Sequence, residues 1–336
     1  MDMQKLKVLA KEKISTVCRI CPICNGIACR GEVPGMGGTG TGRSFQNNVI
    51  ALQSLKLNMR TTHNVTSPDT SCNILGMDLK MPIIGAPIAG IAFNLAGFVS
   101  EQEYAQIILN GCSRAGTFGM TGDGRDRSAY TYGLEAVQQA GIGVPTAKPR
   151  PNADIIELAK QAEQAGAKAI AIDVDAAALI NMTVSGQPVS GKTVEDMREL
   201  KRCINLPIII KGIMTPECAL NCVEAGIDAI VVSNHGGRVL DFTPGTAEVL
   251  PSIKKAVGKS LTVLVDGGVR SGSDVLKMLG LGADAVLIGR PLSFAACGGV
   301  EGVEFMLNKF QTELVAAMIM TGCKDIASIN ESVIYK

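Results

Sequence analysis

Residues 263–291, with the sequence VLVDGGVRSGSDVLKMLGLGADAVLIGRP, decide the fold. A short apolar run is followed by a glycine-containing loop, by a segment whose apolar residues lie three and four positions apart, and by a second apolar run. These periods predict a strand, a helix and a second strand. Both strands are apolar throughout, as expected for a parallel sheet that helices cover on both faces.

The same unit recurs along most of the chain. Apolar runs of this kind lie at residues 82–87, 116–121, 142–147, 169–175, 206–212, 229–234, 261–268 and 285–290. Eight strand-then-helix units within about 210 residues predict an α/β fold of the (β/α)8 TIM barrel type rather than an open sheet. We expect residues 1–80 to form an N-terminal extension packed on a barrel of residues 81–336, in one domain overall, because no Ser/Pro-rich linker separates them.

The composition excludes several classes of partner. With 32 basic and 31 acidic side chains, the chain has no excess positive charge for nucleic acid or an anionic membrane surface. Its apolar runs are broken by Pro, Gly and Asn before they reach the roughly 20 residues of a spanning helix. The first residues lack the apolar core of a secretory signal, and eleven cysteines in a chain of this length do not resemble a secreted disulfide scaffold. We therefore expect a cytoplasmic protein that acts on a small molecule.

Polar residues end most of the later apolar runs. They are Asp173 and Asp175, Lys211, Ser233 and His235, Asp266 and, after Gly289, Arg290. These positions lie at the carboxyl ends of the predicted strands, the face of a barrel where active sites are built. The loops DGGVRS (266–271) and GRP (289–291) add glycine N–H groups, a helix start and two arginines, which together suit a phosphate dianion.

The segment SNHGGR (233–238) holds one of only two histidines in the chain. A core histidine would usually be flanked by bulky side chains, whereas His235 is followed by two glycines. We therefore expect its imidazole to face the barrel mouth. Arg238 could bind a carboxylate through two parallel hydrogen bonds while His235 removes a proton from the neighbouring carbon or oxygen.

Several of these motifs resemble the family of FMN-dependent α-hydroxy-acid oxidases and dehydrogenases, which includes glycolate oxidase and lactate oxidase. The resemblance is strong over 208–219, 231–253, 263–291 and 313–329, and weaker over 38–52 and 74–90. The combination of SNHGGR with DGGVR and GRP is specific. It implies an FMN-binding barrel that oxidises a 2-hydroxy acid to a 2-oxo acid, and a homo-oligomer, a tetramer in this family.

The resemblance also implies roles for individual residues. His235 would be the base, Asp175 the carboxylate that pairs with it, Arg238 the substrate-carboxylate ligand, and Lys211 the cation beside the flavin N1 and O2 edge. Ser233 and Thr121 would contact the flavin ring, and Ala86, Pro87 and Ala89 would lie along it. Asp266, Gly268, Arg270, Gly289 and Arg290 would contact the ribityl chain and phosphate.

The chain departs from the family at the substrate site. The family has a Gln and a Tyr after the third strand, where an ungapped alignment places Pro145 and Ala147. Its second carboxylate-binding Arg corresponds to Met182, and its N-terminal active-site Tyr has no counterpart. We therefore expect a substrate that is larger or differently charged than a simple 2-hydroxy acid. Lys148, Arg125 and Arg127 could replace the missing cation.

The N-terminal segment CRICPICNGIACRGE (18–32) raises a separate hypothesis. Cys18, Cys21, Cys24 and Cys29 have the spacing C-x2-C-x2-C-x4-C, which could ligate an iron–sulfur cluster or zinc, although the fourth spacing departs from the ferredoxin pattern. The alternative is a loop with free thiols. The remaining seven cysteines are expected to be small core residues.

Two other activities fit parts of the pattern. A non-redox flavin barrel resembling type 2 isopentenyl diphosphate isomerase would use the same phosphate loops, but a histidine–arginine pair after strand six is not expected there. Inosine monophosphate dehydrogenase shares the ADAVLIGR type of strand (283–290) but needs a catalytic Cys loop where this chain has His235. The segment SNHGGR therefore favours 2-hydroxy acid oxidation.

Overall fold

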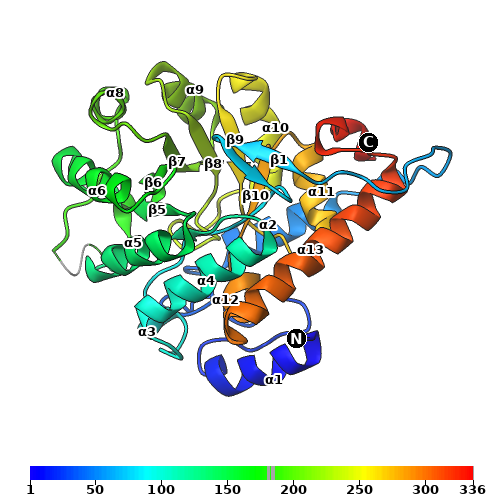
Figure 1. Ribbon diagram of the computed structural model, residues 1–336, viewed down its shortest axis with the longest axis horizontal. Coiled ribbons are helices and arrows are strands. Elements are labelled where there is room, and N and C mark those ends of the chain that lie inside the picture. Colours follow the sequence, from blue (N-terminus) through cyan, green and yellow to red (C-terminus); the bar gives the residue numbers. More distant parts are fainter. Residues whose placement is uncertain (180–181, 183–185, 336) are drawn as a thin grey trace.

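The computed structural model describes residues 1–179, 182 and 186–335, and it confirms the predicted barrel (Figure 1). Eight parallel strands are arranged in the order β3-β10-β9-β8-β7-β6-β5-β4. They are β3 (Ile83–Gly85), β4 (Met120–Thr121), β5 (Val144–Ala147), β6 (Ile170–Asp173), β7 (Ile208–Ile213), β8 (Ala229–Val232), β9 (Thr262–Val265) and β10 (Ala285–Ile288). A parallel bridge between Gly85 and Gly119 links the two end strands and nearly closes the barrel.

Helices form a layer around the strands (Figure 1). They are α4 (Glu101–Ala115), α5 (Ser128–Ala140), α6 (Asn152–Gln164), α8 (Val194–Cys203), α9 (Pro216–Glu224), α10 (Thr246–Val257), α11 (Gly272–Gly280), α12 (Arg290–Ala296) and α13 (Gly299–Thr321). Local sequence explains their ends. Ser100 and Glu103 form a capping box at the start of α4, and Gly116 ends that helix in the left-handed conformation.

Side chains alternate between the barrel interior and the helix layer, as the two-residue period of a strand requires. The interior core contains Ile84, Phe118, Met120, Val144, Ala169, Ala171, Ile209, Ala229, Val231, Leu264, Ala285 and Leu287. One further step of two residues along each strand, or two such steps in β5, reaches the barrel mouth. The inward positions there are Ala86, Gly122, Lys148, Asp173, Lys211, Ser233, Asp266 and Gly289. The mouth is therefore polar over β5–β9 and lined by small residues over β3, β4 and β10.

The N-terminal segment wraps both ends of the barrel. Its helix α1 (Met3–Ile14) buries Leu6, Ala10 and Ile14 in the core that surrounds the strands, beside α12 (Figure 1). The hairpin of β1 (Cys72–Ile74) and β2 (Met77–Leu79) adds its apolar side chains to the interior core, so it covers the end opposite the mouth. Helix α2 (Arg43–Ser54) packs against α10. Residues 35–38, which precede α2, are called the strap below.

Two of the cysteines expected in the core lie on the surface instead. Cys203 and Cys218 are exposed, whereas Cys112, Cys222, Cys297 and Cys323 are buried and Cys72 is half-buried. Cys203 ends α8 and Cys218 lies in the first turn of α9, where the side chains face solvent. No helix in the described part of the chain has the length and apolar character needed to cross a membrane.

Candidate active site

His235 and Asp175 meet at the barrel mouth. Asp175 lies in the turn η1 (Val174–Ala178) after β6, and its Oδ1 is 3.0 Å from His235 Nδ1. The two side chains are 8% and 18% exposed. A carboxylate at Nδ1 favours the tautomer that carries its proton on that nitrogen. His235 Nε2 then keeps its lone pair, and among the described residues it has no hydrogen-bond partner.

The loop after β8 holds His235 in an unusual backbone conformation. His235 has a φ of 56°, in the left-handed region that non-glycine residues rarely adopt, and Gly236 and Gly237 have φ values of 63° and 78°. A Cβ on Gly237 would lie 2.3 Å from the backbone nitrogen of Phe45. The two glycines are therefore required by backbone conformation and by close packing on α2, besides leaving room around the imidazole.

Asp173 is the centre of a second group of charges. Its Oδ2 lies 2.6 Å from Lys148 Nζ, and its Oδ1 lies 2.9 Å from Lys211 Nζ. Strand register explains this arrangement, because Asp173 pairs directly with Lys211 across β6 and β7, and Ala147 pairs with Ile172 across β5 and β6. Burial alone would raise the pKa of Asp173, but the neighbouring His235, Lys148 and Lys211 hold it well below its ordinary value.

Lys211 also faces Asp175, whose Oδ2 is 3.7 Å from its Nζ. Burial by itself would lower the pKa of Lys211, but Asp173, Asp175 and Asp266 raise it above its ordinary value. Lys211 is therefore a fixed, buried positive charge at the mouth.

Several buried polar atoms at the mouth have no hydrogen-bond partner among the described residues. These are Asp266 Oδ1, Asp175 Oδ2 and Thr146 Oγ1. The other oxygen of Asp266 accepts a hydrogen bond from Ser233 Oγ at 2.9 Å, and burial raises the pKa of this carboxyl group. Buried polar atoms in native proteins are nearly always satisfied. The unpaired ones therefore mark a place for a polar ligand.

Three arginines gather on the other side of the mouth. Arg238 Nη1 donates to Gly35 O at 2.5 Å, and Arg290 donates from Nε to Met36 O and from Nη2 to Gly37 O, both at 2.8 Å. The Arg290 guanidinium also lies 3.7 Å from the ring centroid of Phe45. The strap thus crosses the mouth and is held there by the two arginines.

The third arginine connects this cluster to the cysteine segment. Arg270 donates from Nε to Cys24 O at 3.1 Å and approaches Cys24 Sγ with Nη2 at 3.5 Å. Within the described chain, none of these three guanidinium groups forms an ion pair with a carboxylate. Burial, together with the charges of Arg238 and Arg270, lowers the pKa of Arg290 to about 9. The cluster lacks a counter-charge, so it is suited to bind an anion.

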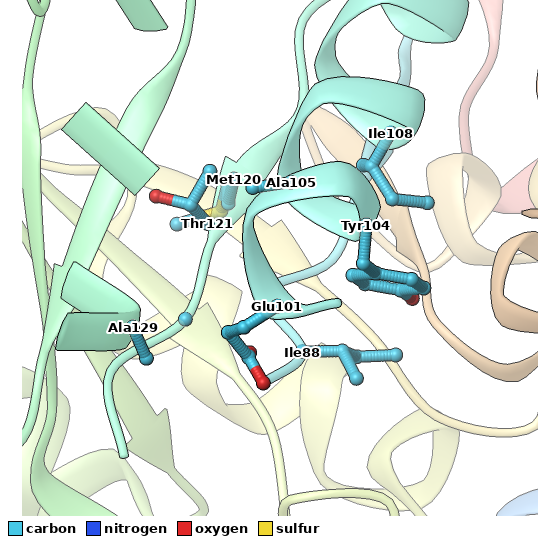
Figure 2. Close-up of a pocket in the computed structure, with 9 residues that line it drawn as sticks. Ile88, Glu101, Tyr104, Ala105, Ile108, Met120, Thr121 and Ala129 are labelled. Atoms are coloured by element: carbon cyan, nitrogen blue, oxygen red, sulfur yellow. The ribbon is translucent and has the colours of Figure 1, made fainter. Parts of the chain in front are cut away.

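The loops after β3 and β4 divide into two environments. Ala86 lies at the mouth beside Gly289. A Cβ added to Gly289 would be 3.8 Å from the Cβ of Ala86. Ala89, two residues past Pro87, approaches Gly122. Thr121 turns away from the mouth: its side chain packs against Gly133 of α5 and lines a small pocket between α4 and β4 (Figure 2). The structure therefore does not bring the Thr121 hydroxyl together with the other predicted site residues.

Asn94 connects the loop after β3 to the arginine cluster. Its Oδ1 accepts a hydrogen bond from Arg238 Nη2 at 2.8 Å, and its Nδ2 donates to Ala89 O at 2.8 Å. Glu101 fixes the same loop by accepting from the backbone nitrogens of Gly90 and Ile91. Nothing in the sequence motifs pointed to Asn94, because its role depends on contacts between residues 144 positions apart.

Among the three possible replacement cations, the structure places only Lys148 at the mouth. Arg127 forms an exposed ion pair with Asp154, and Arg125 lies over the ring of Phe93. The ungapped alignment of β5 is out of phase, because Ala147 packs among helix-layer residues while Val144 faces the interior. The mouth positions of β5 are therefore Thr146 and Lys148, rather than Pro145 and Ala147. Met182 is fully buried.

The four N-terminal cysteines do not form an assembled metal site. All four lie within the described chain and are half-buried, but no three of their sulfur atoms come within 4.8 Å of one another. A tetrahedral zinc with bonds of about 2.3 Å to sulfur holds its ligands about 3.8 Å apart. Binding of zinc or an iron–sulfur cluster here stays a prediction.

Comparisons with known proteins decide which family this site belongs to. The model of the FMN-dependent dehydrogenase family matches residues 35–186 and 181–336. The chain belongs to the FMN-dependent dehydrogenases. It is 32% identical to the 2-hydroxyacid oxidase of Dictyostelium discoideum over 87% of this chain and 82% of that protein. It is 31% identical to the L-lactate oxidase of Lactobacillus jensenii, over 86% of this chain and 77% of the relative.

The fold of this FMN-dependent dehydrogenase matches solved structures as well. A mandelate oxidase variant with a monooxide FMN adduct superposes with a TM-score of 0.74 at 31% identity, covering 89% of this chain and 93% of that one. The protein is therefore an FMN-dependent oxidoreductase with a TIM barrel. The predicted homo-oligomer and the cytoplasmic location stay predictions.

The residues of this FMN-dependent dehydrogenase fit an FMN molecule at the mouth. The arginine cluster lacks a counter-charge, which a phosphate would supply. Ala86 and Gly289 present only small side chains at one side of the mouth, where a flat ring could lie. On the other side, Asp266 presents a buried oxygen without a partner to a ligand's hydroxyl groups.

Proposed function

We propose that the protein oxidises a 2-hydroxy acid to the corresponding 2-oxo acid, with His235 as the base and Arg238 as the ligand of the substrate carboxylate. The observation that carries the proposal is the half-buried His235–Asp175 pair, in which Nε2 has no hydrogen-bond partner among the described residues. A base in this position serves the removal of a proton during oxidation. The oxidase names of the similar proteins support the choice of substrate class.

Bound FMN would accept the two electrons that the substrate loses. Arg270 and Arg290 would bind its phosphate with the N–H groups of Gly268 and Gly289, and Asp266 its ribityl hydroxyls. Ser233 and Lys211 would contact the ring, and Ala86, Pro87 and Ala89 would lie along it. Thr121 could reach the cofactor only through its backbone, since its side chain packs on α5.

The side chains of the chain supply the proton chemistry. His235 Nε2 takes one proton from the substrate and becomes an imidazolium. Asp175 stabilises that charge from Nδ1, at 3.0 Å. The guanidinium of Arg238 orients the substrate by its carboxylate, and Asn94 and the strap hold the guanidinium in place.

Two substitutions separate these roles in anaerobic flavin-reduction experiments. His235→Ala should retain FMN and bind substrate but lower the reduction rate by about 10²–10⁴-fold, because the base acts only as charge develops. Arg238→Met should weaken substrate binding as well as turnover, because a carboxylate ligand acts in ground state and transition state alike. A wild-type reduction rate in His235→Ala would refute the assignment of the base.

A further inference from the structure

Lys148 and Asp173 are the charged mouth residues for which the proposed reaction gives no role. Their side chains are 9% and 4% exposed, and their charged atoms are 2.6 Å apart. Burial of two charges is costly unless they are paired, so a pair at this depth has to be held in place by its surroundings. Each of the two residues is held by its own set of contacts.

Lys148 is fixed from its backbone. Its N–H donates to Asp123 Oδ2 at 2.9 Å. The same carboxylate binds the fully buried Arg150, with Arg150 Nε 3.1 Å from Oδ2 and Nη2 3.0 Å from Oδ1. The loop after β5 is thereby held in place, and the Lys148 side chain reaches Asp173 at the end of the neighbouring strand β6.

Asp173 in turn faces the base. Its Oδ1 lies 3.5 Å from His235 Nδ1, the same nitrogen that Asp175 Oδ1 approaches at 3.0 Å, and the Asp173 and Asp175 carboxyl groups also interact with each other. Two carboxylates therefore act on one imidazole nitrogen. Each would stabilise the imidazolium, and each is partly neutralised by a lysine: Lys211 faces both, and Lys148 faces Asp173 alone.

We propose that Lys148 and Asp173 form a charge pair that sets how readily His235 takes up a proton, a role that rests on the proposed function of His235 as the base. Both are positioning residues, since they act through His235. Lys148 neutralises part of the charge of Asp173 and so limits the attraction of that carboxylate for a proton on the imidazole. Asp173 supports the imidazolium once it forms.

The proposal predicts opposite effects for the two members of the pair. Removing Lys148 leaves Asp173 ionised, because Lys211 still binds it, and the unbalanced carboxylate favours the imidazolium. Removing the charge of Asp173 leaves an excess of positive charge around His235 and disfavours the imidazolium. The other charged groups around His235 stay in place: Asp175 after β6, Lys211 on β7, Asp266 after β9, Arg238 after β8 and Arg290 after β10.

The two histidines of the chain make a direct test practical. In the FMN-loaded enzyme with ¹³C-labelled histidine, NMR follows the protonation of His235, while the exposed His63 serves as an internal reference. Lys148→Met should move the His235 midpoint to higher pH, and Asp173→Asn to lower pH, each by about one pH unit. The double variant K148M/D173N should return it close to the wild-type value.

The double variant keeps the test valid if Asp173→Asn folds poorly, because it also removes the Lys148 ammonium, while Lys211 keeps Asp175 at 3.7 Å as its counter-charge. Lys201→Met is the matched control: it breaks a Lys201–Asp228 ion pair of 2.5 Å at the opposite end of the barrel and should leave the midpoint unchanged. Shifts of the two single variants in the same direction, or no shift in Lys148→Met, would overturn the proposal.

This readout does not depend on turnover, so its failure can be told apart from failure of the proposed function. If no 2-hydroxy acid reduced the FMN bound to the wild-type enzyme, the proposed function would be refuted. In active enzyme, the acidic limb of the kcat/KM profile should follow the His235 midpoint in each variant. If Lys148→Met raised KM but left the acidic limb of the kcat/KM profile at the wild-type pH, Lys148 would be a substrate ligand instead. That result would also overturn the charge-pair proposal.

Discussion

Asp175→Asn tests the pair that carries the proposed mechanism. The substitution keeps the size of the side chain but removes its charge, 3.0 Å from His235 Nδ1. At that distance two unit charges interact by at most about 5.5 kcal/mol at an effective dielectric of about 20. Lys211 lies 3.7 Å from the other carboxylate oxygen and offsets part of this interaction. A hydrogen bond to a charged group contributes about 1.5–3 kcal/mol, which we take as the loss.

A loss of that size predicts that flavin reduction slows by about 10- to 100-fold. Stopped-flow absorbance under anaerobic conditions measures this rate directly, at saturating concentrations of the acid that reduces the wild type fastest. FMN content should not change, because the contacts of Asp175 are with His235 and Lys211 and not with the three arginines proposed for the anion site. Asp154→Asn makes the same chemical change in an exposed ion pair and should have no effect. An Asp175→Asn rate within about twofold of wild type would refute the role of the pair.

Three further predictions follow from the charges of the mouth. Arg290→Met should weaken FMN binding by about 10- to 100-fold, measured by the fluorescence of released flavin, and unchanged affinity would contradict the phosphate site. Lys211→Met should lower the flavin reduction potential by on the order of tens of millivolts, measured against reference dyes, because the anionic reduced ring loses its neighbouring cation. The depressed pKa of Asp173 makes it stabilise the fold above about pH 4 and lose that contribution as pH falls. The acid-induced drop in the free energy of unfolding should therefore be smaller in Asp173→Asn, as urea titrations between pH 3 and 6 would show.

The barrel was predictable because each parallel strand is a local apolar run, and the polar residues that end these runs lie on one face of the fold. The pairing of His235 with Asp175 was expected from family resemblance, and their geometry agrees with it. The Lys148–Asp173 pair was not expected, since it depends on register across strands. A shift of one residue in β5 exchanges inward for outward side chains, as the misplaced Pro145 and Ala147 show.

Contacts between residues far apart in the sequence could not be predicted either. The strap binds Arg238 and Arg290 from about 200 and 250 residues away, and nothing local in its glycine-rich sequence indicates that it crosses the mouth. The outward direction of the Thr121 side chain could not be predicted for a different reason. Its strand has only two residues, too few for the alternation of side chains to be read from the sequence.

The most direct test of 2-hydroxy acid oxidation is an anaerobic titration of the FMN-loaded wild-type enzyme with a panel of 2-hydroxy acids that differ in size and charge. We predict that at least one acid bleaches the flavin absorbance, and that one equivalent of the matching 2-oxo acid forms for each FMN reduced. If dithionite reduced the flavin but none of these acids did, the proposed function would be contradicted.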